Sequence, residues 1–220
     1  MRNVKILAAL GLMTMAGIAQ ADVTGTATIV NDYDFRGVTQ TLEDPALQIS
    51  LDYAGGPWYV GVWGSNVDFG STDPTTELDL YTGFKGATEG GLGWDVGVVY
   101  YSYPAASDIN TAEIYGKLTY SVITGALFYT DNYFDTSEDE FYVSVDAAIP
   151  AGPVSLNLHA GYSDSKAFAD DSYTDYSVGV SYSASNLTLG LKWVTNSDYF
   201  GKGVSDDRVI LSVSTALPWK

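Results

Sequence analysis

The sequence has no cysteine, one histidine and only ten lysine and arginine residues among its 220. The lack of cysteine excludes disulfides, thiolate nucleophiles and thiolate metal sites. With 27 acidic residues the net charge is −17, and no basic stripe is available to neutralise phosphates. No phosphate-binding glycine loop, zinc-ligand cluster or EF-hand pattern is found. We therefore expect no nucleic-acid partner, no cofactor and no bound metal.

The first 21 residues have the composition of a cleaved secretory signal peptide. Arg2 and Lys5 precede a mostly apolar run, residues 6–18, and Ala19-Gln20-Ala21 has the small-x-small pattern of a cleavage site. The alternative is an N-terminal membrane anchor, but the run is shorter than a spanning helix requires. We expect cleavage before Asp22, which leaves a mature domain of residues 22–220. This removes two bases and no acid, so the net charge becomes −19.

From Val23 onward apolar and polar residues alternate with a period of two, which is typical of β-strands with one apolar face. No stretch approaches the 18 consecutive apolar residues of a transmembrane helix. The alternation predicts twelve strands, each of about ten residues, the length of a tilted strand that crosses a bilayer. The predicted strands are residues 23–35, 45–54, 58–67, 76–85, 92–103, 111–121, 123–132, 140–149, 154–163, 173–183, 187–196 and 207–217.

The connections between these strands alternate between long and short. The long ones are polar and mostly acidic, and the short ones carry glycine, proline and asparagine. Outer-membrane barrels have this asymmetry, with long external loops, short periplasmic turns and an even number of strands. The sequence therefore predicts an all-β fold, a twelve-stranded antiparallel up-and-down transmembrane β-barrel. The alternative is a soluble β-sandwich or lipocalin-like barrel.

The two faces of the predicted strands favour the membrane barrel. One face carries apolar residues without charge, and a mid-plane charge facing lipid would cost roughly 2–4 kcal/mol. The other face carries many acids, which a dry soluble core would not bury unpaired. The clearest apolar sets are Leu47/Ile49/Leu51, Phe141/Val143/Val145, Val154/Leu156/Leu158, Leu187/Leu189/Leu191 and Val209/Leu211/Val213.

The polar face predicts a lumen that attracts cations, because rings of acids favour cations and repel anions. The alternative is a lumen plugged by its own side chains. The candidate pore or constriction residues are Arg36, Asp32, Asp34, Asp52, Glu77, Asp79, Lys85, Asp95, Glu113, Lys117, Asp146, His159, Lys192 and Arg208.

Arg36 is the only basic residue between the signal region and Lys85, and it lies in the segment 31–41 that closes the first strand. One hypothesis is that this segment bends inward and that Arg36 pairs with wall acids to form a constriction. The other is a solvated loop arginine beside a Gly37 turn. The expected partners under the first hypothesis are Asp32, Asp79 or Asp95.

Aromatic residues gather where most upward strands end, which is typical of the girdle at a membrane–water boundary. The alternative is aromatic packing inside a soluble fold. The predicted girdle residues are Tyr33, Phe35, Trp63, Phe69, Tyr101, Tyr103, Tyr129, Tyr133, Trp193 and Tyr199.

Catalysis is the competing class of function, because some twelve-stranded outer-membrane barrels are lipases that use serine, histidine and asparagine. His159 shares a strand face with Ser155 and Asn157. Alternate side chains on one strand lie about 7 Å apart, too far for direct hydrogen bonds. A catalytic partner would have to come from a neighbouring strand, so we expect no enzyme and a histidine that lines the lumen.

Six segments together resemble the TorF-type putative porin family, long catalogued as bacterial proteins of unknown function. The resemblance is dense over residues 31–120 and looser afterwards. It implies an outer-membrane barrel with a presumed porin role and supplies no established catalytic or substrate residues. Outer-membrane proteins usually end on an aromatic residue, whereas this chain ends on Trp219-Lys220, which we expect either to shift the assembly signal by one residue or to weaken insertion. The segments are residues 33–41, 45–48, 52–53, 61–69, 77–81 and 95–104.

The expected function is passive diffusion of small solutes across the bacterial outer membrane, weakly cation-preferring or open to neutral and zwitterionic solutes. The alternatives are a non-conducting structural or adhesive barrel and, last, an outer-membrane hydrolase. The expected partners are outer-membrane lipid, lipopolysaccharide, small solutes and the barrel-assembly machinery.

Overall fold

The structure, a computed structural model, describes residues 22–70, 74–168, 172–197, 204 and 207–217. The predicted signal peptide, residues 1–21, lies outside this part, as do Tyr199 and the terminal Trp219-Lys220. Within it, no helix is long and apolar enough to cross a membrane.

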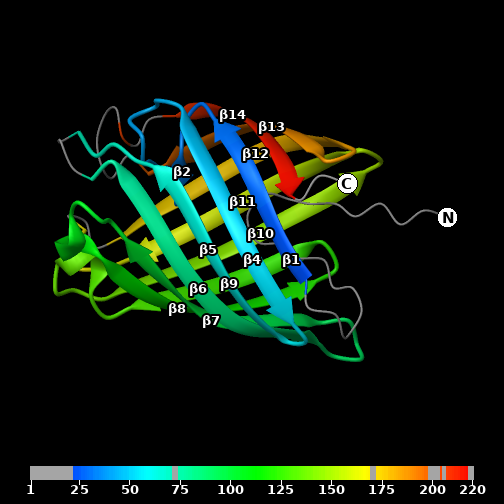
Figure 1. Cartoon of the computed structure of the whole chain (residues 1–220), viewed down its shortest axis with the longest axis horizontal. Helices are drawn as coiled ribbons and strands as arrows, with labels where there is room; N and C mark the ends of the chain where they lie inside the picture. The colour runs from blue at the N-terminus through cyan, green and yellow to red at the C-terminus, as the bar shows by residue number, and fades with distance from the viewer. Residues whose placement is uncertain (1–21, 71–73, 169–171, 198–203, 205–206, 218–220) are drawn as a thin grey trace.

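Twelve antiparallel strands form one closed barrel, because the first strand pairs on one side with the second long strand and on the other with the last (Figure 1). Every other long strand pairs with its neighbours in sequence, so the topology is up-and-down. The predicted fold is confirmed. The strands of the wall are β1 (Asp22–Val30), β4 (Ala46–Gly55), β5 (Trp58–Asn66), β6 (Thr76–Ala87), β7 (Gly93–Ser102), β8 (Thr111–Tyr120), β9 (Ile123–Thr130), β10 (Glu140–Ala151), β11 (Val154–Asp164), β12 (Ser172–Ala184), β13 (Leu187–Asn196) and β14 (Arg208–Leu217).

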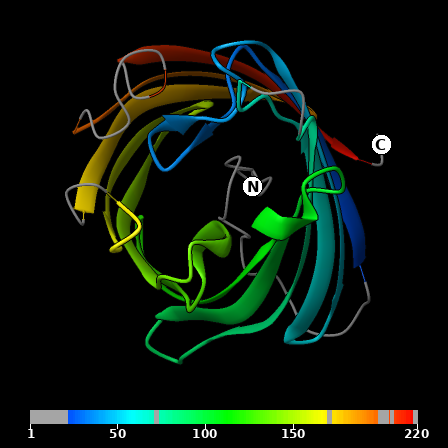
Figure 2. The same cartoon turned by 90° about the vertical axis from the view of Figure 1, so that its left-hand side faces the viewer.

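The long connections lie together at one end of the barrel and partly fill its mouth. The first of them contains a hairpin of two short strands, β2 (Asp34–Phe35) and β3 (Val38–Thr39), which projects into the barrel opening (Figure 2). Two short 3-10 turns, η1 (Ser107–Ile109) and η2 (Tyr133–Asp135), belong to later connections at the same end.

The first predicted strand, residues 23–35, is too long at its end. The wall strand stops at Val30, and the chain then leaves the wall to form the inward hairpin. The aromatic side chains of Tyr33 and Phe35 pack inside the barrel, where they bury surface that a longer wall strand would have left beside the loops.

The apolar face of the strands points outward, as predicted. All fifteen residues of the five apolar sets are between 38% and 58% exposed, although all of them lie within the wall strands. Apolar side chains exposed in a continuous band around a closed sheet are what a lipid-facing surface requires.

Part of the predicted aromatic girdle is wrong. Tyr33, Tyr101 and Tyr103 are buried inside the barrel, and Trp63 packs against the same inner cluster. The physical reason is the pleat: successive side chains alternate between faces, so at the end of β7 the outward ring is that of Tyr100.

Two other predicted girdle positions also belong to the loops. Phe69 contacts Tyr103 with ring centroids 5.7 Å apart, and Tyr133 packs on Phe134 and Phe168 at 4.6 and 5.3 Å. Of the predicted set, Trp193 points outward from the wall, and so does Tyr129, whose cross-strand partner is the exposed Phe141.

Outward-facing aromatic side chains nevertheless form two belts, one near each end of the strands, as in membrane barrels. The belt near the long loops consists of Tyr100, Tyr129, Phe141, Tyr162, Tyr176 and Trp193, and the belt near the short turns consists of Tyr53, Trp58, Phe84, Trp94, Tyr120 and Tyr182.

Candidate pore constriction

The tip of the β2–β3 hairpin is a two-residue turn, Arg36-Gly37, in which both residues have positive φ angles of 50° and 80°. This is the geometry of a type I′ hairpin turn. Glycine adopts it freely, and a Cβ at Gly37 would lie 2.6 Å from the Cβ of Asp175. For a non-glycine residue such as Arg36, the left-handed conformation costs roughly 1–2 kcal/mol. Contacts of the Arg36 side chain must offset that cost.

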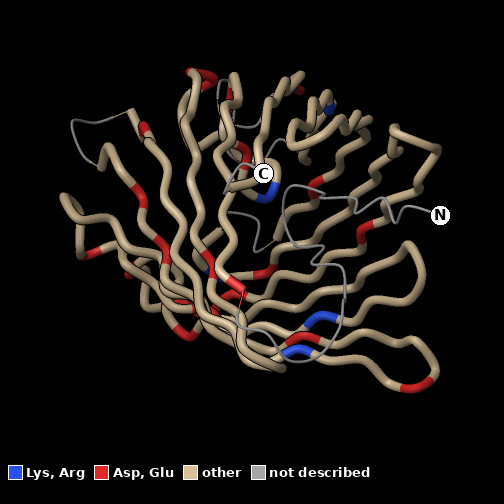
Figure 3. Tube along the Cα trace, turned by 45° about the vertical axis from the view of Figure 1, so that its right-hand side comes forward, with Lys and Arg blue, Asp and Glu red and all other residues tan. Residues whose placement is uncertain are grey.

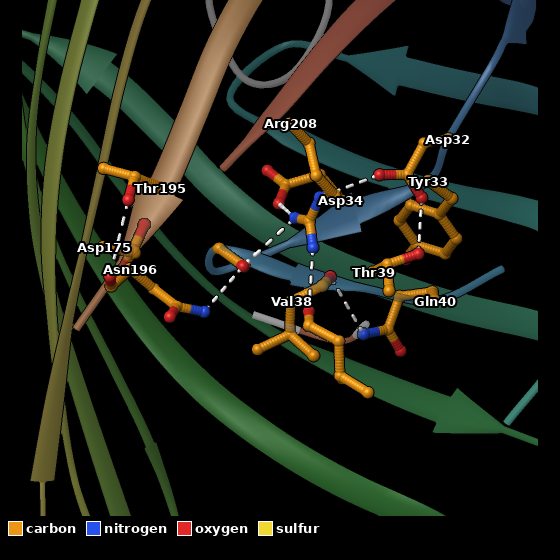
Figure 4. Close-up of polar contacts among 12 residues, drawn as sticks. Asp32, Tyr33, Asp34, Val38, Thr39, Gln40, Asp175, Thr195, Asn196 and Arg208 are labelled. Atoms are coloured by element: carbon orange, nitrogen blue, oxygen red, sulfur yellow. Dashed lines mark hydrogen bonds and ion pairs between the residues drawn. The ribbon is translucent and has the colours of Figure 1, made fainter. Parts of the chain in front are cut away.

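Arg208 of β14 fastens one side of the hairpin to the wall (Figure 4). Its Nε lies 2.9 Å from Oδ2 of Asp32, and its Nη2 lies 2.5 Å from Oδ1 of Asp34 and donates to the carbonyl oxygen of Gly37 at 3.1 Å. Asn196 of β13 donates to the same carbonyl at 2.8 Å. The root and the turn are therefore both held by the last two strands.

Two more contacts complete this anchor. Lys192 Nζ lies 2.9 Å from the second carboxylate oxygen of Asp34, and the Thr39 hydroxyl donates to Asp32 at 2.5 Å. Asp34 thus contacts two cations, and Asp32 contacts one cation and one hydroxyl. Such partners are what a desolvated carboxylate requires.

From this anchor, the side chain of Arg36 reaches strands on the far side of the ring. Its Nη2 lies 2.8 Å from Glu113 on β8, and its Nη1 lies 2.7 Å from Glu140 on β10. Tyr101 donates to the same oxygen of Glu113 at 2.9 Å. Since β8 is opposite β14 in the strand order, the hairpin with its arginine spans the lumen.

Aromatic rings surround the Arg36 guanidinium as well. Its central carbon lies 4.3 Å from the ring centroid of Tyr142, 4.7 Å from that of Phe35 and 5.2 Å from that of Phe128. Burial lowers the pKa of Arg36, but the carboxylates of Glu113 and Glu140 outweigh burial and raise it well above its ordinary value. The guanidinium is thus a permanent cation buried inside the barrel.

The expected partners of Arg36 are corrected by this geometry. Asp32 pairs with Arg208, Asp95 accepts a hydrogen bond from Tyr59 at 2.6 Å, and Asp79 has no ion pair within the described chain. Sequence reasoning placed Glu113 among the pore residues but missed Glu140, which it put at the start of the predicted strand 140–149 without counting it as a lumen residue. The alternation of side chains along β10 would have identified Glu140 as a lumen residue. Phe141 faces outward, so its neighbour Glu140 must face inward.

Glu77 and Asp79 lie on the inward face of β6, beside the hairpin. Glu77 accepts a hydrogen bond from Tyr103 at 3.2 Å, and both side chains are at least nine-tenths buried. Trp63 on β5 and Tyr101 on β7 are the cross-strand neighbours of Asp79. This pair of acids, with its aromatic neighbours, is hereafter the β6 acid pair.

The half of the lumen nearer the short turns carries a separate charged row. Lys85, Asp95 and Lys117 are cross-strand partners on β6, β7 and β8, and all three are only half-buried. Tyr59 donates to Asp95 and also contacts the hydroxyl of Tyr115. Lys85 lies over the Tyr59 ring at 5.2 Å.

Asp52 and its neighbour Tyr81 also belong to this inner region. The Tyr81 hydroxyl donates to Asp52 at 2.5 Å, and the hydroxyl of Ser50 donates to the second carboxylate oxygen at 3.4 Å.

His159 on β11 bridges two carboxylates. Its Nδ1 lies 2.7 Å from Asp146 and its Nε2 lies 2.7 Å from Asp175, with the Tyr142 hydroxyl 3.0 Å from Nε2. In the described part of the chain, none of its hydrogen bonds goes to a serine, and Ser155 instead bonds to a backbone carbonyl. The described residues therefore show no hydrogen bond between His159 and a serine, the contact that a serine hydrolase uses.

Charge and exposure together divide the lumen. Acidic residues occur along the length of the barrel, whereas lysine and arginine residues are few (Figure 3). Around the hairpin, the inward acids are buried and in contact with the hairpin or its neighbours. Below it, Asp95, Asp146 and the two lysines keep part of their surface exposed. The side chains around the hairpin are thus the most closely packed of these inward charged groups.

The family comparison gives one match. The model of a family described as "Bacterial protein of unknown function (Gcw_chp)" matches residues 16–209. No curated protein matches the chain significantly. The finer TorF-type resemblance stays a prediction.

Among solved structures, the chain is similar to two porins. The first is "KdgM porin in complex with disordered oligogalacturonate", with a TM-score of 0.57 and 9% identity over 88% of this chain and 97% of that chain. The second is the NanC porin, with a TM-score of 0.54 and 8% identity over 89% of this chain and 98% of that chain. At such low identities the similarity concerns the fold.

Proposed function

Because this chain belongs to the Gcw_chp family of bacterial proteins of unknown function and shares the barrel fold of KdgM and NanC, we propose that it is an outer-membrane channel. Its solutes are small and either cationic, zwitterionic or neutral, and they diffuse passively. The barrel would lie among lipid and lipopolysaccharide after folding by the barrel-assembly machinery.

The observation that carries this proposal is the hairpin that crosses the lumen. A loop folded inward and pinned to opposite walls narrows a barrel to a defined constriction while its outer face stays in lipid. Arg36 with Glu113 and Glu140 provides the pin on one side, and Arg208 with Asp32 and Asp34 provides it on the other. The half-exposed row below the hairpin supplies a polar vestibule.

The charge balance supports a preference for cations. KdgM is named as a complex with oligogalacturonate, which is an acidic oligosaccharide. The protein described here has 27 acidic residues against ten basic ones. Rings of acids raise the local concentration of cations and exclude anions. We therefore place the solute of this chain in a different charge class from an oligogalacturonate.

Single-channel recording in planar bilayers tests the proposal. Purified protein whose migration on a gel changes on heating is folded, and such protein should give discrete current steps and a reversal potential on the cation-selective side in a salt gradient. An absence of current steps from folded protein would remove the channel.

A non-conducting barrel is the second candidate, and close packing in the outer half favours it. Tyr103, Glu113 and Glu140 are each 2% exposed or less, which is the burial of a protein core. Under this reading, the hairpin is a permanent plug, and loosening it by Arg36→Ala would still give no current. Under the channel reading, the same variant conducts better than the wild type.

A further inference from the structure

In the half of the lumen nearer the long loops, each buried acid forms an ion pair with a basic side chain, with one exception. Glu113 and Glu140 meet Arg36, Asp32 and Asp34 meet Arg208, and Asp175 meets His159. The exception, within the described residues, is the β6 acid pair, for which no ion pair is formed.

The β6 acid pair is also incompletely hydrogen-bonded. Glu77 is 2% exposed and Asp79 is 9% exposed, and Oε2 of Glu77 and Oδ1 of Asp79 accept no hydrogen bond in the described structure. A buried carboxylate oxygen that accepts no hydrogen bond adds to the desolvation cost of its group. Such oxygens are therefore the atoms on which a cation from outside the chain would gain most.

Aromatic residues lie next to the β6 acid pair. Trp63 and Tyr101 flank Asp79 from the two neighbouring strands, and the ring of Tyr33 lies 5.3 Å from that of Trp63. Tyr33 lies close to both carboxylates: burial raises the pKa of its hydroxyl, and the charges of Glu77 and Asp79 raise it further.

The surroundings of Arg36 indicate which ligand such a set of groups suits. There the guanidinium meets two carboxylates and three aromatic rings at 4.3–5.2 Å. The β6 acid pair likewise combines two carboxylates with neighbouring aromatic residues, and the described residues form no ion pair with it. Charge-assisted hydrogen bonds and cation–π contacts are the interactions that bind organic cations.

We propose that the β6 acid pair is a binding site for a small organic cation of the guanidinium or alkylammonium class. Glu77 and Asp79 hold the positive group, while Trp63, Tyr33 and Tyr101 contact its flanks. The site deepens the proposed function, in that it names the class of solute which the constriction selects, but cation binding itself does not require conduction.

Direct binding to folded protein in detergent tests the site. The probes are methylguanidinium and propylammonium chloride, with sodium chloride at equal ionic strength as the reference, and the readouts are titration calorimetry and the fluorescence of Trp63 relative to Trp63→Phe. We expect saturable binding of at least one probe above the sodium reference. In Glu77→Gln/Asp79→Asn the affinity should fall at least about tenfold, because two charge-assisted contacts are lost.

Asp108→Asn is the matched control, because it removes an exposed carboxylate of the same mouth and should bind like the wild type. If neither probe binds more tightly than sodium, or if Glu77→Gln/Asp79→Asn binds as the wild type does, the site is refuted. Folding of the variant is checked by heat-modifiable migration, and each single variant, Glu77→Gln and Asp79→Asn, serves if the double variant does not fold.

The two proposals fail separately. Current steps without probe binding would refute the cation site and leave the channel. Probe binding that depends on Glu77 and Asp79 in a protein that passes no current would refute the channel and leave the site.

Discussion

Arg36 and Glu140 are 104 residues apart in the chain, yet a guanidinium nitrogen of one lies 2.7 Å from a carboxylate oxygen of the other. The contact joins the first long loop to the first residue of β10. Both side chains are almost fully buried, so the pair is screened little by water or salt. We therefore expect this pair to influence how firmly the hairpin is held and how wide the lumen is.

Arg36→Ala should destabilise the barrel and widen it. Removal of the guanidinium leaves Glu113 and Glu140 as buried, uncompensated charges, which costs about 3–5 kcal/mol. Unfolding by urea in detergent, followed by tryptophan fluorescence, measures the stability, and bilayer recording measures the conductance, which we expect to increase. Arg36→Lys keeps the charge but loses the second nitrogen, so its effect should be intermediate. Wild-type stability and conductance in Arg36→Ala would show that the pair neither holds the hairpin nor sets the width of the lumen.

Arg208→Gln should loosen the hairpin at its root. Asp32 and Asp34 would lose their shared guanidinium partner, and we expect a current that flickers between levels as the hairpin moves. Lys192→Gln is the control, since among the described residues the ion pair of Lys192 is with Asp34 alone and its side chain is one-third exposed, so its loss should cost less than about 1 kcal/mol. Equal noise in the two variants would contradict the anchoring role of Arg208.

Leu158→Arg and Asn157→Arg test the two faces of β11 with neighbouring residues. Leu158 points to lipid, where an arginine near mid-plane costs about 2–4 kcal/mol, while Asn157 points to the lumen and should accept the charge. Folding yield into lipid vesicles, read from heat-modifiable migration, should fall for the first variant and stay near wild type for the second. A similar yield for both would mean that the barrel does not sit in lipid as we describe.

His159→Leu should destabilise the barrel through Asp175. That carboxylate is 2% exposed and loses its cation, whereas Asp146, the other partner of His159, is 41% exposed and remains hydrated. We expect a loss of about 3 kcal/mol in unfolding free energy, of which a good part returns when Asp175→Asn is added. Asp146→Asn added instead should recover little. Recovery by Asp146→Asn and not by Asp175→Asn would reverse this assignment.

The barrel could be predicted because its information is local. Period-two alternation, the contrast between long and short connections, and uncharged outward sets such as Leu187, Leu189 and Leu191 each follow from neighbouring residues. Strand ends were less certain, and the girdle failed at Tyr101 and Tyr103 because parity, rather than composition, decides which ring meets lipid.

The contacts of the hairpin could not be predicted in the same way. The isolated basic residue Arg36 could be recognised in the sequence, and an inward bend of residues 31–41 was one of the two hypotheses that the sequence left open. Its partners were not, because they are set by which strands lie opposite each other in the closed ring. Glu113 is 77 residues from Arg36 and Glu140 is 104. No periodicity encodes a contact across a lumen.

The anchoring of the hairpin also fixes an order of events during assembly. The hairpin follows directly after β1, but Arg208, which holds it, lies on β14, and β14 reaches β1 only when the ring closes. Until then Asp32 and Asp34 have no guanidinium to pair with, and the segment remains free. We therefore expect the hairpin to take its place only after the ring has closed, so a protease that cuts at residues 31–41 should distinguish an open sheet from a finished barrel.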